Sequence, residues 1–243
     1  MTGIKHAVGA IGALALLAAC GGGGDGGDSE FASGSASSIQ SASIDDMKSV
    51  ESLHVKGSVT QQGSELGRDV TLTADGDCVG SISISGDNSG SAELISVSGS
   101  SWFKPDEEFW RTQAGPQAEQ IISKVGDKWV QLPEGDESFS TVCDLDQMLD
   151  PLSEKSKSLE KGQTEEVDGQ DAIKLTRDDQ ESGGTVTTWV AVDNPHHIVK
   201  FETEAGDASS SSTLSQFDQD AAIEAPADDE VITVEELQQQ TQQ

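Results

Sequence analysis

The most constraining feature of this sequence is a long run in which apolar and polar side chains alternate. Between Leu53 and Phe103 apolar residues fall on alternate positions within successive stretches, which are Leu53, Val55 and Val59, then Leu66, Val70 and Leu72, and then Cys78, Ile82 and Ile84. Such alternation is typical of strands that bury one face and leave the other in water. Asp75-Gly76 interrupts the run, and this pair favours a tight hairpin turn because its residues tolerate positive φ. The pattern predicts an antiparallel meander with one apolar and one polar face.

Helical spacing replaces the alternation in three places. A short helix is expected over residues 44–50, in front of the first strand. Two further apolar stripes have helical spacing: Ala118, Ile121, Ile122, Val125 and then Leu145, Met148, Leu149, Leu152. Strands resume after Asp168-Gly169 and continue to Phe217. The expected fold class is α+β, mainly β.

The N-terminus has the features of an export signal that ends at a cysteine. Lys5 precedes an apolar run over residues 7–17, which is shorter than the roughly 20 residues that a membrane span needs. Leu17-Ala18-Ala19-Cys20 resembles a bacterial lipobox, in which the cysteine thiol receives a diacylglyceryl group and the chain is cut before it. The alternative is an ordinary signal peptide with a chance cysteine. We expect an exported lipoprotein, anchored to the outer face of the cell membrane by a lipid on Cys20.

Composition shifts divide the rest of the chain. Residues 1–19 form the predicted signal peptide, and residues 20–41 the acylated cysteine with a flexible Gly/Ser-rich tether. Residues 42–226 are long enough for one domain with a real core. Residues 227–243 end in glutamines, and we expect this C-terminal segment to be partly disordered.

The charge of the chain excludes several classes of partner. Its formal net charge is -30, from 44 acidic and 14 basic residues. Such a surface repels nucleic acid and anionic headgroups, so binding to DNA or RNA is excluded. We expect a monomer whose contact with the membrane is made through acylated Cys20.

Two cysteines remain once Cys20 is assigned to lipid. Cys78 and Cys143 form an even pair in an exported chain, which favours a disulfide between them. The alternative is two buried free thiols, since cysteine is often buried. A metal site is not expected, because no second Cys or His stands at ligand spacing near either residue.

The sequence offers little that suggests catalysis. His6 leaves with the signal peptide, and His196-His197 follow a turn, where adjacent side chains point apart and cannot easily share a metal. His54 falls on the polar side of the first strand. No Gly-x-Ser-x-Gly motif, triad pattern or phosphate-binding glycine loop is present. We expect no enzymatic activity, no cofactor and no metal.

Several features together resemble a known family. A helix and meander precede an insertion containing Lys128-Trp129-Val130, then Gly162-x-x-x-x-Val167-Asp168-Gly169 and strands with Trp189-Val190, before an end at Ala225-Pro226. Over residues 44–237 this resembles the actinobacterial LppX/LprG-type lipoproteins, relatives of the LolA/LolB carriers. The resemblance implies a strongly curved antiparallel sheet, a half-barrel, with a few helices covering its concave face. It also implies a lipid or glycolipid ligand held between the sheet and the helices.

In such a fold, ten apolar side chains are expected to line the ligand cavity. They are Ile82, Ile84, Leu94, Phe103, Ile121, Ile122, Leu145, Met148, Leu149 and Leu175. For any single one of these residues a place in a solid core is the favoured alternative. The alternative function is therefore an envelope lipoprotein that binds a protein or acts as a sensor, with a packed interior and no ligand.

Lipidation of Cys20 can be tested directly. Cys20→Ser should move the protein from the membrane fraction into the aqueous phase of a detergent partition, because the acyl chains would be its anchor. A variant that is still cleaved normally yet stays in the membrane fraction would contradict the lipobox assignment.

Overall fold

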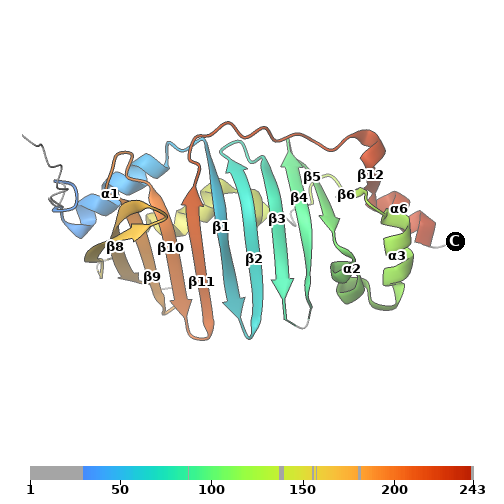
Figure 1. Ribbon diagram of the computed structural model, residues 1–243, viewed down its shortest axis with the longest axis horizontal. Coiled ribbons are helices and arrows are strands. Elements are labelled where there is room, and N and C mark those ends of the chain that lie inside the picture. Colours follow the sequence, from blue (N-terminus) through green and yellow to red (C-terminus); the bar gives the residue numbers. More distant parts are fainter. Residues whose placement is uncertain are drawn as a thin grey trace, which may run out of the picture.

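The computed structural model describes residues 30–86, 88–136, 140–154, 156, 158–179 and 182–241, so Cys20 and the predicted leader lie outside the described residues. The described part contains one large, curved, unclosed sheet of twelve strands (Figure 1). The first six strands are β1 (Ser52–Gln61), β2 (Ser64–Thr73), β3 (Cys78–Ser85), β4 (Gly90–Val97), β5 (Ser100–Pro105) and β6 (Trp129–Gln131). The others are β7 (Glu160–Val167), β8 (Gln170–Asp178), β9 (Thr185–Ala191), β10 (Ile198–Ala205), β11 (Ala208–Ser215) and β12 (Val231–Thr233).

The chain builds the sheet outward from its middle. The strand order is β12-β6-β5-β4-β3-β2-β1-β11-β10-β9-β8-β7. After β6 the chain crosses to the far edge at β7 and returns strand by strand until β11 pairs with β1. Within the described sheet every pairing is antiparallel except the parallel pair β12–β6. The predicted fold class is confirmed.

Two glycines allow the strands to approach closely where the sheet curves. Gly57 and Gly80 fall on the same face of the sheet as Val55 and Cys78, by the alternation along β1 and β3. A Cβ atom at Gly57 would lie 2.3 Å from the carbonyl oxygen of Ser211, and one at Gly80 would lie 2.2 Å from a backbone oxygen of β2. Any larger residue would push the neighbouring strands apart.

The helices form two groups. Behind the sheet in Figure 1 lie α1 (Ala36–Met47), α4 (Ser140–Cys143), α5 (Leu145–Leu149) and the 3₁₀ turn η2 (Asp150–Ser153). At the β12 end lie α2 (Glu107–Ala114), η1 (Gly115–Gln117), α3 (Ala118–Val125) and α6 (Val234–Thr241), with η3 (Asp228–Glu230) before β12. Residues 140–153 are called the roof below. None of the helices in the described ranges combines the length and the apolar character that crossing a bilayer requires.

The main core lies between the sheet, α1 and the roof. Its central sheet residues, Leu53, Val55, Val70 and Leu72, are at most 1% exposed. They define the concave face of the sheet, since they pack in one cluster with Ile39 of α1 and with roof residues. A smaller cluster around Val130 and Ile232 packs at the β12 end.

Both ends of the folded region extend beyond the predicted boundaries. The first helix begins at Ala36, capped by Ser35, so residues 36–41 of the predicted tether are helical. This start was missed because Ile39 is the single large apolar residue among serines and alanines there, yet it is 1% exposed. The C-terminal segment, predicted to be partly disordered, adds β12 to the sheet and continues as a helix to Thr241.

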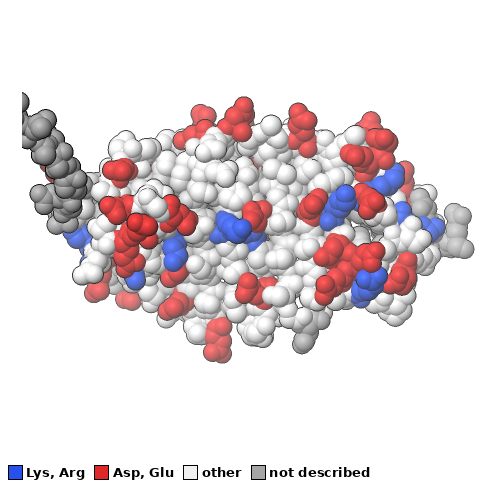
Figure 2. All heavy atoms as spheres, viewed as in Figure 1, with Lys and Arg blue, Asp and Glu red and all other residues white. Residues whose placement is uncertain are grey.

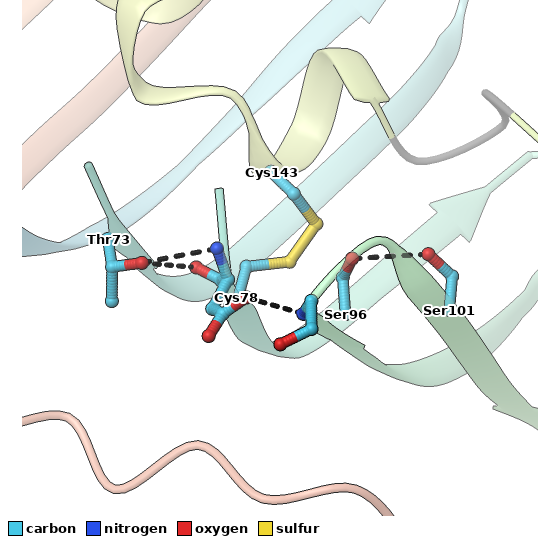
Figure 3. The surroundings of a disulfide bond; sticks show 7 residues. Thr73, Cys78, Ser96, Ser101 and Cys143 are labelled. Atoms are coloured by element: carbon cyan, nitrogen blue, oxygen red, sulfur yellow. Dashed lines mark hydrogen bonds between the residues drawn. A yellow bond between two sulfur atoms is a disulfide. The ribbon is translucent and has the colours of Figure 1, made fainter. Parts of the chain in front are cut away.

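A disulfide joins the roof to the sheet. Cys78 of β3 and Cys143 at the end of α4 are bonded, with their Cα atoms 5.4 Å apart (Figure 3). Ser96 of β4 and Ser101 of β5 lie beside the bond and are hydrogen-bonded to each other. The predicted Cys78–Cys143 disulfide is therefore present, and it links residues that are 65 positions apart in the sequence.

Two histidines between β9 and β10 pack against other parts of the fold, His196 against the α1 region and His197 against Phe217. The backbone N–H of His196 donates to Asp46, and its ring stacks on Phe31 with ring centroids 3.4 Å apart. The His197 side chain is buried and lies 4.1 Å from the Phe217 ring, centroid to centroid. Burial lowers the pKa of His197, and the nearby charge of Asp218 opposes this shift only in part. Both histidines lie between β9 and β10, and the His197 side chain is also part of the packing.

Removal of the disulfide should destabilise the fold. The Cys78→Ala/Cys143→Ala protein should lose about 4 kcal/mol of unfolding free energy, because the bridge restricts the unfolded chain over this separation. Denaturant unfolding measures the loss, and non-reducing peptide mapping of the wild type should find the linked fragment. Two alkylatable thiols in the native protein would contradict the bond.

Stability should fall as His197 becomes protonated in the unfolded chain. Because its pKa is lower in the folded state, the unfolded state binds the proton first as the pH falls below about 6.5. The unfolding free energy of the wild type should therefore drop more between pH 7.5 and 5.5 than that of His197→Gln. A constant difference between the two proteins over this range would show that His197 is not the group responsible.

Candidate functional site

The ten predicted cavity residues lie in three different parts of the structure: the main core and its margin, the cluster at the β12 end, and partly exposed positions. Leu94, Leu145 and Leu175 are at most 5% exposed in the main core, and Ile82, Met148 and Leu149 pack against that core from its margin. Phe103 and Ile121 belong to the separate cluster at the β12 end. The remaining two, Ile84 and Ile122, are partly exposed. Sheet and roof residues thus meet as predicted, but the ten do not line one common space.

The roof is held to both halves of the sheet. The disulfide attaches it to β3, and Arg177 of β8 attaches its other end. The Nη2 atom of Arg177 donates to the carbonyl of Pro151 at 2.6 Å, and its Nη1 lies 3.3 Å from a carboxylate oxygen of Glu154. Gln40 of α1 donates to the Glu154 carbonyl. Leu145 and Leu152 of the roof pack directly into the core, so side chains occupy the space beneath it.

The part of the concave face nearest the β1–β2 turn is open to solvent. Val59 is 43% exposed and Leu66 is 44% exposed, although both fall on the concave face by alternation from Val55 and Val70. Val59 is paired with Leu66 in the register, and Leu66 with Ile84. Val59, Leu66 and Ile84 are together called the open row below. It places apolar side chains at the surface where the roof does not reach.

Arg68 occupies the concave face between the open row and the core. It stands between Leu66 and Val70 on alternate positions of β2, with Ile82 opposite it on β3. Gly57 of β1 lies opposite Arg68 and has no side chain. The Nη2 atom of Arg68 therefore reaches across β1 and donates to the hydroxyl of Ser212 on β11 at 3.2 Å. The Nε atom is buried without a hydrogen-bond partner, and burial lowers the pKa of the guanidinium. No carboxylate among the described residues lies within ion-pair distance of Arg68.

A groove lies beside β3, β4 and β5 and the helices α2 and α3. Its volume is about 640 Å³, within the range of roughly 300–1,000 Å³ typical of ligand pockets. Ile82, Ala92 and Pro105 are register partners along its sheet side, and Trp110 and Ile122 line it from the helices. Charged side chains line it as well: Glu93, Lys104, Asp106, Glu107 and Asp127. One lining residue, Ile82, is the register partner of Arg68.

A second hollow lies beside the disulfide and has a different character. It measures about 430 Å³ and includes Ser96, Ser101, Asp144 and Asp146 in its lining. Hydroxyl and carboxylate groups dominate there, so this hollow is poorly suited to an apolar ligand.

The titratable groups on the outer face form ordinary surface pairs. His54 lies 3.0 Å from Asp69 and also contacts Thr71, and Lys56 pairs with the same carboxylate. Figure 2 shows this face with acidic side chains scattered over it and the basic ones in isolated places. Within the described ranges no group of three or more His, Cys, Asp or Glu side chains is arranged to hold a metal ion.

Comparison with solved structures identifies the fold. LprF from Mycobacterium bovis matches 80% of this chain and 100% of its own, with a TM-score of 0.60 and 16% sequence identity. The lipoprotein LppX from Mycobacterium tuberculosis matches 77% of this chain and 99% of its own, with a TM-score of 0.52 and 19% identity. No protein-family model and no curated protein matches the sequence. The LppX/LprG-type resemblance is thereby confirmed at the level of the fold: this chain has the half-barrel of LprF and LppX.

Proposed function

We propose that the protein is a membrane-anchored extracytoplasmic lipoprotein that binds and carries a lipid or similarly apolar ligand, without catalysing a reaction. The observation that carries this proposal is the exposed open row, and the groove of about 640 Å³ lies further along the sheet, with Ile82 in its lining. Large apolar side chains grouped at a surface mark sites for apolar partners. Anchoring depends on lipidation of Cys20, which the sequence predicts.

The ligand would occupy the edge of the concave face rather than its centre. Leu94, Leu145 and Leu175 are closely packed beneath the roof. The open row and the groove are accessible without any movement of the roof. An acyl chain lying along them would cover apolar surface, and each buried CH₂ group contributes about 0.8 kcal/mol.

The packed interior also favours the alternative function. A lipoprotein that binds a protein or acts as a sensor would need no ligand space beneath the roof, and the filled core suits such a role. In that case the open row would be a protein contact. Binding of a small acyl probe distinguishes the two functions.

Val59→Glu should weaken binding of a fluorescent acyl probe by about tenfold or more, because it places a charge where the chain would lie. Stability should change little, since Val59 is 43% exposed. The matched control is Thr60→Glu, which adds the same charge at the next position on the outer face of β1. Probe titration and thermal unfolding of all three proteins provide the measurement. If the wild type does not bind the probe, or if both variants weaken binding equally, the carrier function is contradicted.

A further inference from the structure

Arg68 is a charged side chain on the concave face that has no carboxylate within ion-pair distance among the described residues. Alternation places uncharged residues at the concave positions of β1, β3, β4, β10 and β11, all of which the structure describes. On β2 the same positions hold Ser64, Leu66, Arg68, Val70 and Leu72. Across these six strands, Arg68 is therefore the single charged residue on the concave face.

The other concave cations of the sheet differ from Arg68 in their partners. Arg177 contacts Glu154 and the carbonyl of Pro151, and Lys161 donates to the carbonyls of Ala32 and Gly34. Within the described residues, the one side-chain hydrogen bond of Arg68 is to a neutral hydroxyl, that of Ser212. A guanidinium remains protonated in proteins, so its charge is partly desolvated without compensation. Such an arrangement is costly unless an anion completes it.

We propose that Arg68 binds the acidic head group of the ligand, and that the ligand is an amphiphile with a carboxylate or phosphate on an apolar chain. This inference rests on the proposed carrier function. The unpaired Nε atom offers a donor in the planar fork that suits carboxylate and phosphate oxygens. Ser212, 3% exposed, accepts from Arg68 and can donate its own proton to the same anion.

The surroundings provide a place for the chain. Leu66 is the next concave residue on β2, and beyond it the open row runs to the turn. A head group at Arg68 therefore leaves the chain in contact with Leu66 and Val59. The acidic neighbours on β2, Glu65 and Asp69, fall on the outer face by alternation, and Asp69 is paired there with Lys56. Repulsion from the other acidic groups of the surface is screened beyond about 8 Å at physiological ionic strength.

The test compares laurate, methyl laurate and dodecyl phosphate by calorimetric titration. The wild type should bind laurate or dodecyl phosphate at least about tenfold more tightly than the ester, a preference worth about 1.4 kcal/mol. Comparison of the two anions identifies the head group as carboxylate or phosphate. Arg68→Met should lose the preference while it still binds the ester, and Arg68→Lys should keep part of it. The matched control Lys56→Met, which removes a cation from the outer face of the neighbouring strand, should keep the full preference.

Three other results would contradict the role of Arg68, and one of them would also contradict the carrier function. Equal binding of acid and ester by the wild type would overturn the assignment of Arg68 and leave the carrier function standing, and this comparison needs no variant. A preference that persists in Arg68→Met would overturn it as well. If none of the three compounds binds the wild type, both the head-group site and the carrier function are wrong.

Discussion

The fold depends on the pairing of β1 with β11. These strands pair residues such as Lys56 and Thr213, which are 157 positions apart along the chain, and they unite two meanders into one sheet. Without this pairing, β1 and β11 would each be an exposed edge with unsatisfied backbone groups. The pairing also brings Ser212 within reach of Arg68 across Gly57. The β1–β11 pairing therefore holds the sheet together and also brings the residues of the candidate site into contact.

The curvature of this sheet creates a concave face that its few short helices cover only in part. The disulfide and Arg177 fix the roof over the middle of that face, where the core is packed. Toward the β1–β2 turn the same face continues without cover. An apolar surface of this kind either binds a partner or favours aggregation. A net charge of -30 opposes aggregation through such a surface, because like-charged molecules repel one another.

The features that could be predicted from the sequence are those that depend on neighbouring residues along the chain. The alternation of Leu53, Val55, Val70 and Leu72 marked the buried face, because side chains alternate on any strand. Strand order, the start of α1 and the short strand β12 depend on distant partners and were not foreseen. Arg68 was not identified as a site residue from the sequence, because only the apolar residues of β2 on either side of it, such as Leu66 and Val70, were considered. Its position on the apolar face was visible in the alternation, but its contact with Ser212 requires the β1–β11 register.

We have proposed that the concave face holds an apolar ligand that is not covalently bound. Native mass spectrometry of the Cys20→Ser protein, purified from an exporting and acylating host, tests this proposal without interference from the covalent lipid. We expect an added mass that dissociates on activation and that organic extraction recovers as an acidic amphiphile. A protein that carries only its own mass, and that takes up no acyl compound when exposed to one, would contradict the claim.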